Sequence, residues 1–438
     1  MRRRIAPRVR PYHHPDRAGA RPIADVTMSA ACSYSESEIM ALAQAAGWQS
    51  VALPTAGALV GYLILIFANP AHRFFRDGLR CVQRHPRMWI WLSVLGLAYT
   101  LFQNLQAYQL GEAQFSLASL LDWPGFKPHD WRATAGHAWL PALELLAGLF
   151  NQAVVSYPTS AAAALLFTIN WRGYQMQFLR AAKGRLGRWW VGVYLGLVLC
   201  AFAAFCKPIF SLSIYWLNQY FDGIFLLRVG AIIDWLSFQF EYLFGLLIQI
   251  FLVLLTFVWI RGLNAEPGRV FEFALKRAVF AAKWAGVVLV ATFLLIHLPL
   301  LISYAWITQQ TDFTSAVVQY IEQTARPLIA LGLVLFCSIQ INLILHNETL
   351  REAVLEHAQL VRNHWHRIFW FLMVAGLHLF AISWLNDFLG DAFPKYSMQS
   401  LLLAALFTVG KAFLAAWFLA SWVCFYRASV TPREPIRF

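Results

Sequence analysis

The sequence predicts an all-α protein, a polytopic transmembrane helix bundle with about nine spans. Apolar residues make up 59% of the 438 positions and charged residues 13%, about half the charged share of a soluble domain. Nineteen Trp raise the aromatic share to 16%, and most of them lie near the ends of long apolar runs, as a bilayer interface favours. Basic residues recur in short clusters between those runs, which is typical of cytoplasmic membrane loops.

The formal net charge of +13 does not indicate nucleic acid as a partner, because the basic residues are not gathered in one domain. The six Cys are scattered, without a CxxC motif and without a Cys/His pair at zinc-binding spacing. Neither a metal centre, another cofactor nor a disulfide framework is therefore predicted. Cys residues inside apolar runs are expected to act as small packing residues.

The chain divides into an N-terminal segment (1–50), a single transmembrane domain (51–427) and a short cytoplasmic tail (428–438). Residues 1–27 carry seven Arg and no sustained apolar run, so they do not form a secretory signal. Two interpretations stay open: a disordered basic arm, or a translation start at Met28. We favour Met28, because the predicted topology would otherwise require these seven Arg to cross the membrane.

A transmembrane helix needs about 20 largely apolar residues. The third of the predicted spans is interrupted by Ser156–Ser160, which predicts a kink or a new helix start at Pro158. Residues 208–227 are apolar too, and we expect them to be interfacial or re-entrant. The predicted spans are 51–69, 88–106, 141–168, 189–206, 236–260, 284–304, 327–346, 367–385 and 399–426.

Lys and Arg predict the orientation, since cytoplasmic loops are enriched in both. Alternate loops between the spans, with the C-terminal tail, hold 21 of these residues, and the intervening loops hold six. The richer set is expected in the cytoplasm of a bacterial cell. The C-terminus is then inside and, with nine spans, the N-terminus is outside.

Four hairpins repeat a common pattern, in which a span is followed by a basic amphipathic segment that we expect to form a cytoplasmic elbow helix. The segments begin at Arg73, Trp171, Val270 and Leu350. In the first, Arg73, Arg76, Arg80, Arg84 and Arg87 form one helical stripe opposite Phe75, Leu79 and Val82. In the fourth, the predicted apolar face is Leu350, Val354, Ala358 and Val361.

We expect these elbow helices to lie in the inner headgroup layer, apolar side down, with each basic residue gaining roughly 1 kcal/mol against anionic lipid. The alternatives are a simple topology anchor and a specific lipid-headgroup site. The candidate lipid contacts are Arg73, Arg76, Arg80, Arg84, Arg87, Arg180, Lys276 and Arg362.

The fourth segment, LREAVLEHAQLVRNHWHRIFW followed by FLMVAGLHLFAI, resembles the repeated units of the bacterial membrane domains named after glycerophosphoryl diester phosphodiesterase. The resemblance touches most of residues 50–430 and implies a membrane architecture. It does not imply the phosphodiesterase activity, because no soluble catalytic domain is present and the membrane domain has no assigned catalytic residues.

Polar residues inside the apolar runs are candidate functional positions, because ionisable groups are costly in a membrane. Lys411, Glu144, Asn151 and Glu241 form the candidate intramembrane polar site, with Lys411 near the middle of the last span. An ion pair between Lys411 and Glu144 or Glu241 is one possibility. His297 and His378 are expected to be packing residues, since neither has a second potential metal ligand at i+4.

Searches for phosphate-binding, metalloprotease and serine-hydrolase motifs find none in the sequence. The leading hypothesis is a non-enzymatic membrane protein that organises lipids or serves as an accessory subunit of an envelope complex, with a possible protein partner in the membrane. The alternative is a transporter for a lipid-like or small solute, and a membrane enzyme acting on lipids ranks third.

Overall fold

The computed structural model describes residues 47–109, 131–151, 157–169, 179–180, 183–184, 187–263, 266–306, 311–346, 349–390, 393 and 397–430. Every regular element in these ranges is a helix, so the predicted all-α class is confirmed. The expectations about Met28, most of the second basic segment and residues 431–438 lie outside the described residues. Residues 1–62 and 63–438 form two compact units, and the sites below all lie in the second.

The elements follow one another as α2 (Gly47–Phe67), α3 (His72–Arg84), α4 (Arg87–Gln109), α5 (Trp131–Asn151), α6 (Tyr157–Ile169), η3 (Gly187–Trp189), α8 (Trp190–Leu217), α9 (Gly223–Ile260), α10 (Pro267–Thr292), η4 (Phe293–His297), α11 (Leu298–Trp306), α12 (Thr311–Tyr320), η5 (Ile321–Ala325), α13 (Arg326–Leu335), α14 (Ile339–Leu345), α15 (Leu350–Gly390) and α16 (Met398–Ser429).

Six helical stretches among the described residues are long and apolar enough to cross a bilayer, and these make the chain a multi-pass membrane protein. A seventh is obtained if the bent pair Phe313–Leu335 and Ile339–Leu345 is counted as one span. The expected number was nine. The first and third predicted spans are absent from this set, and the seventh, 327–346, falls in the bent pair. The six are Arg87–Tyr108, Gly187–Leu217, Gly223–Ile260, Pro267–Tyr304, Leu350–Gly390 and Met398–Ser429.

The third predicted span, 141–168, is divided between two helices. Helix α5 ends at Asn151 and α6 begins at Tyr157, one residue before the predicted restart at Pro158. Proline is tolerated in the first turn of a helix, where its missing N–H has no intrahelical partner. With 13 residues, α6 is too short to cross a bilayer alone.

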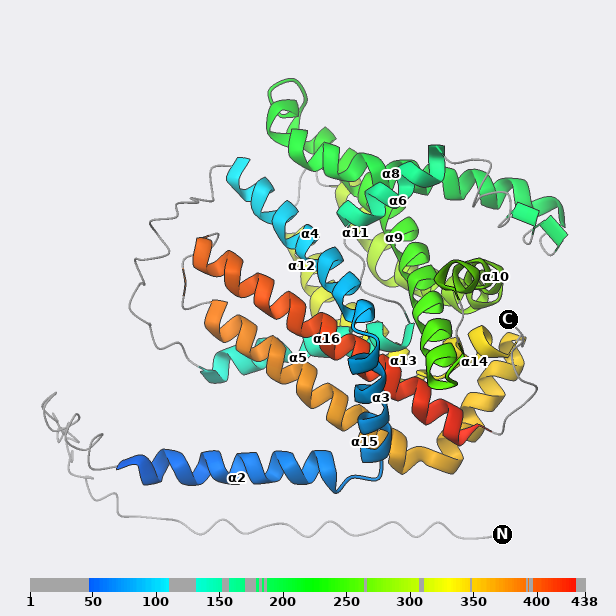
Figure 1. Cartoon of the computed structure of the whole chain (residues 1–438). Coiled ribbons are helices and arrows are strands. Elements are labelled where there is room, and N and C mark those ends of the chain that lie inside the picture. Colours follow the sequence, from blue (N-terminus) through cyan, green and yellow to red (C-terminus); the bar gives the residue numbers. More distant parts are fainter. Residues whose placement is uncertain are drawn as a thin grey trace, which may run out of the picture. The chain divides into compact units, whose positions relative to one another are not determined.

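Helix α9 is the most buried of the candidate spans: 61% of the residues in its most apolar stretch are buried inside the protein. Its C-terminal half, from Leu246 to Val258, contributes much of the main core. Helices α4, α16 and α15 lie side by side in Figure 1, and α3 crosses α16. The core is therefore built where α9 meets the helices from both ends of the chain.

The segment 208–227 is not a separate interfacial or re-entrant element. Helix α8 continues through Leu217, and α9 begins at Gly223 after a short turn. The backbone N–H groups of Tyr220 and Phe221 donate to the carbonyl of Leu217 at 3.0 Å and close this turn. The two helices of this hairpin are thus longer than the predicted spans 189–206 and 236–260, and α9 alone has 38 residues.

The four predicted basic segments do not form four equivalent elbow helices. The first forms α3, a separate helix of 13 residues. The third is the beginning of α10, and the fourth is the beginning of α15, where His364 has a non-helical backbone conformation. Thr349 and Glu352 cap the start of α15 reciprocally, through N–H···O contacts of 2.8 and 3.3 Å.

The apolar face of the fourth segment differs from the predicted one. Ala353, His357 and Leu360 are buried, whereas Val354 is 39% exposed. The reason is polar: the Ser338 hydroxyl lies 2.7 Å from Nδ1 of His357, and the Asn342 amide donates to the carbonyl of Ala353 at 3.1 Å. These contacts orient the helix toward α14 by a face that hydrophobicity alone does not mark.

Candidate functional site

A buried polar joint connects α5, α10 and α13 at the end of α5. The Asn151 amide donates to the carbonyl of Leu333 at 3.2 Å, and its Oδ1 accepts from Nε1 of Trp284 at 2.9 Å. Asn151 is 1% exposed, so these contacts take place away from water. The predicted polar residue Asn151 therefore joins three helices at the place where the third predicted span is divided.

A second pair of amides extends this joint toward α9 and α14. Gln249 donates to the carbonyl of Leu149 at 2.8 Å, and its Oε1 accepts from the amide of Gln340. All seven residues of α14 are buried. The break between α13 and α14, with a bend of 50°, is thus buried on its α14 side, whereas Leu335 and Phe336 on its α13 side are 58% and 43% exposed.

Glu144 does not pair with Lys411. Its carboxylate accepts from Nε and Nη2 of Arg326 at 2.7 and 2.8 Å. Arg326 directly precedes the predicted span 327–346, which predicts a loop position, yet it is the first residue of α13. The planar guanidinium fork matches both carboxylate oxygens, an arrangement that a lysine ammonium cannot reproduce.

Glu241 does not pair with Lys411 either. The Lys207 ammonium lies 3.5 Å from Glu241 and 3.4 Å from Asp234. The ion pairs of the described residues do not include Lys411. The proposed four-residue site is therefore three separate centres, one around Glu144 and Asn151, one around Glu241 and one at Lys411.

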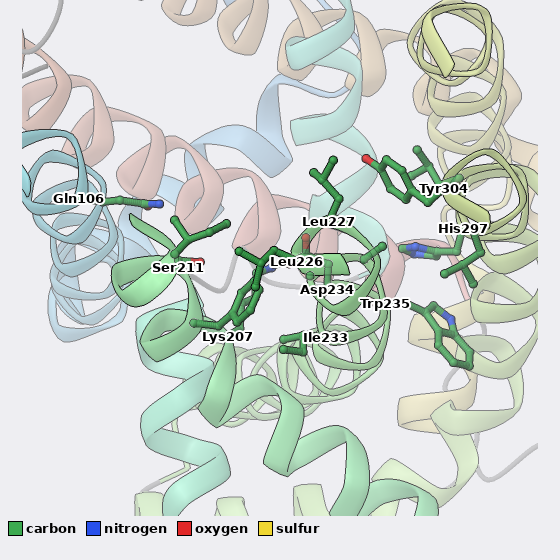
Figure 2. Close-up of a pocket in the computed structure, with 16 residues that line it drawn as sticks. Gln106, Lys207, Ser211, Leu226, Leu227, Ile233, Asp234, Trp235, His297 and Tyr304 are labelled. Atoms are coloured by element: carbon green, nitrogen blue, oxygen red, sulfur yellow. Dashed lines mark ion pairs between the residues drawn. The ribbon is translucent and has the colours of Figure 1, made fainter. Parts of the chain in front are cut away.

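A pocket of about 310 Å³ lies beside the Lys207 centre. Figure 2 shows Lys207 of α8, Asp234 of α9 and His297 of η4 around it. His297 had been assigned to packing. It sits in a single π-helical turn, a feature frequent at functional sites, and its buried Nε2 has no hydrogen-bond partner within the described part of the chain.

Lys207 and Asp234 were missed as site residues because they follow and precede the apolar runs that predicted the spans. Lys207 directly follows the predicted span 189–206, so the sequence predicts a loop position for it. The signal that would have found them is helical spacing: Asp234 and Glu241 are seven residues apart, which puts both on one face of α9. Sequence alone does not show that Lys207 on the neighbouring helix faces them.

The basic stripe of α3 is exposed and its apolar face is buried. Arg73, Arg76, Arg80, Arg84 and Arg87 are all exposed, as are Arg180, Lys276 and Arg362. The apolar face does not point toward lipid as expected. Phe75 stacks on Phe371 with ring centroids 4.9 Å apart, and Trp417 Nε1 donates to the Phe75 carbonyl at 2.8 Å, so α15 and α16 cover this face.

Helix α3 approaches α16 closely at Gly78. A Cβ added there would lie 2.2 Å from Oγ and 2.6 Å from the backbone nitrogen of Ser421. Three residues further along, Cys81 is buried at 8% exposure, and this burial raises the pKa of its thiol to about 11, despite the nearby Arg84. Helix α3 is therefore seated directly on the α16 backbone.

The described residues contain no group of three or more His, Cys, Asp or Glu that could hold a metal ion. The five Cys in this part of the chain are free. Comparisons with protein families, with curated proteins and with solved structures find no match to the chain. The resemblance to the phosphodiesterase-associated membrane domains therefore stays a prediction.

Proposed function

We propose that the protein is a non-enzymatic multi-pass protein of the bacterial cytoplasmic membrane that organises anionic lipid at its cytoplasmic face. The observation that carries this proposal is the division of α3 into a buried apolar face and an exposed arginine face. Phe75 is 1% and Val82 0% exposed, so packing accounts for one side of the helix. It gives no reason for the stripe of arginines on the other.

The arginine stripe has little carboxylate to neutralise it. Asp77 is the one acidic residue in α3. Its distances of 3.9 Å to Arg76 and 3.8 Å to Arg80 are long, and all three side chains are more than 40% exposed. Ion pairs this long and this exposed contribute little interaction energy. The face consequently keeps a net positive charge, and lipid phosphates would gain roughly 1 kcal/mol per basic residue there.

Two further arginines extend this surface beyond α3. His85 stacks on Trp259 with ring centroids 4.1 Å apart, which places the end of α3 beside the end of α9. Arg261 follows α9 directly, and Arg427 of α16 reaches the carbonyl of Ile260 at 3.5 Å. In the proposed orientation, with the C-terminus inside, these groups all belong to the cytoplasmic side.

Native mass spectrometry of the protein purified gently from its own membrane tests this function. We expect retained phosphatidylglycerol or cardiolipin. Replacing Arg73, Arg76, Arg80 and Arg84 by Gln should lower the number of retained anionic lipids, and the same four changes to Lys should preserve it. Equal retention by the Gln and Lys variants would contradict the proposal, and a bound polypeptide would instead favour the accessory-subunit hypothesis.

A transporter for a lipid-like or small solute is the second candidate, and the interrupted helices favour it. Asn151, the last residue of α5, bonds to Leu333, three residues before the break after α13. Transporters place substrate sites where discontinuous helices meet. Lys411, near the middle of the last predicted span, is the charged candidate for such a pathway: if Lys411→Leu changes neither stability nor complementation of a deletion strain, the residue has no part in it.

A further inference from the structure

The pocket beside Lys207 lies between α8, the N-terminal part of α9 and the turn from η4 into α11, with Gln106 of α4 at one side. Its volume of about 310 Å³ falls at the lower end of the range for small-molecule sites. Most lining residues are apolar. Besides the phenol of Tyr304, the titratable side chains among them are Lys207, Asp234 and His297, which Figure 2 shows on three different helical segments.

The charges of this centre do not balance. Lys207 Nζ lies 3.4 Å from Oδ1 of Asp234 and 3.5 Å from Oε1 of Glu241, so one ammonium serves two carboxylates. Glu241 also accepts from the Ser237 hydroxyl at 2.8 Å. The three charged side chains together therefore carry one negative charge.

Asp234 is the carboxylate with capacity left for a ligand. Its side chain is 64% exposed, compared with 19% for Glu241 and 20% for Lys207. An ionised carboxylate has about four acceptor positions, and Lys207 approaches one oxygen of Asp234. Arg228 does not line the pocket; its Nε donates to the carbonyl of Tyr304 at 3.1 Å and ties α9 to α11.

The walls around Asp234 suit the apolar body of a ligand. Phe210, Trp235 and Tyr304 contribute aromatic rings, and Leu226, Leu227, Leu300 and Leu301 contribute aliphatic surface. Figure 2 shows the His297 imidazole directed into the space on the far side of Asp234 from Lys207. A neutral imidazole can accept an N–H hydrogen bond, and aromatic faces attract cations.

We propose that this pocket binds a small primary amine with an apolar body, whose ammonium group donates to the Asp234 carboxylate. The ammonium group of such a ligand would neutralise the surplus negative charge of the pocket, and its apolar body would contact the apolar walls. An anionic ligand would be repelled by the surplus negative charge, because Lys207 is already engaged by two carboxylates. The inference goes beyond lipid organisation and depends on none of the residues in the arginine stripe.

Three probes of equal carbon skeleton separate charge from hydrophobicity: 3-phenylpropylamine, 3-phenylpropan-1-ol and 3-phenylpropanoate. Binding to the full chain in nanodiscs is measured at pH 7 by isothermal titration calorimetry. We expect the amine to bind about tenfold or more tightly than the alcohol, since one charge-assisted hydrogen bond separates them. The carboxylate should bind least. Equal binding of all three, or preference for the carboxylate, would overturn the proposal.

Asp234→Asn and Asp222→Asn form a matched pair. Asp222 is exposed at the start of α9 and does not line the pocket. Asp234→Asn should lower amine affinity about tenfold and leave the alcohol unchanged, whereas Asp222→Asn should change neither. Ala231→Phe, which fills the pocket from α9, should abolish binding of all probes. Amine binding that survives both Asp234→Asn and Ala231→Phe would place the ligand elsewhere and refute the assignment.

Discussion

The carboxylate of Glu144 and the guanidinium of Arg326 form two parallel hydrogen bonds that join α5 to α13. The two residues are 182 positions apart, and Asn151 and Leu333, which also bond, have the same separation. Helices α5 and α13 therefore run parallel and in register. Each is followed by a short helix, α6 or α14, and then by a basic stretch and a long helical hairpin, so the order of elements recurs along the chain.

Replacing Arg326 by Lys keeps the charge at α13 but removes the fork. We expect a loss of about 1 kcal/mol in the free energy of unfolding, since both side chains are partly exposed and screened. Arg326→Ala should lower the free energy of unfolding somewhat more, because it also removes the charge. A double-mutant cycle with Glu144→Gln, followed by thermal unfolding in detergent, measures the coupling, and additive effects would show that the fork contributes no stability.

Asn151→Leu should destabilise the protein by about 1–3 kcal/mol, because it leaves the buried Trp284 N–H and Leu333 carbonyl without their partner. Asn104→Leu is the matched control. Asn104 lies in α4, and its side-chain hydrogen bond within the described part of the chain goes to the carbonyl of Thr100 in its own helix. An Asn151 variant as stable as the Asn104 variant would contradict the polar joint.

Gly78→Ala tests the contact of α3 with α16. The new methyl group would overlap the Ser421 backbone, so we expect a loss of about 1–3 kcal/mol and a displaced α3. Gly286→Ala in α10, where a Cβ meets nothing within 4 Å, should be neutral or slightly stabilising. Thermal midpoints of the two variants decide: equal values would mean that α3 does not rest on α16.

His85 should make stability depend on pH. Burial, followed by the Arg84 charge, lowers the pKa of His85 below its ordinary value of 6.5. As the pH falls below 6.5, the unfolded chain takes up this proton before the folded chain does, so the free energy of unfolding decreases. His85→Phe keeps a ring on Trp259 without a titrating group. Its thermal midpoint should fall less than the wild type between pH 7.5 and 5.5, and parallel curves would exclude a role of His85.

Composition and periodicity predict the all-α membrane class of this protein well and the contacts between its distant side chains poorly. The spacing of Arg73, Arg76 and Arg80 predicts the helix α3, because helical geometry is local. The partner of Glu144 is not predictable in this way, since Arg326 lies 182 residues away. The predicted span that corresponds to α8 ends too early, at residue 206, because Lys207 and Pro208 interrupt the apolar run, whereas the helix continues through Pro208 to Leu217.

The buried face of α15 shows the same limit. Its first turns present two possible faces one residue apart, and the apolar pattern favours Val354 over Ala353. The polar residues Ser338 and Asn342 of the preceding segment reverse this choice through His357 and the Ala353 carbonyl. A sequence pattern within one helix cannot contain that information, because it lies in the neighbouring element.

The 38 residues of α9 measure roughly 57 Å at 1.5 Å per residue, nearly twice the ~30 Å thickness of a hydrocarbon core. Asp234 stands toward one end of this helix and Trp259, with the arginines beside it, at the other, roughly 38 Å away along the axis. A ligand in the pocket and the lipids at the arginine surface would therefore contact opposite ends of the same helix. Any signal between them would take the form of a tilt or axial shift of α9 as a whole.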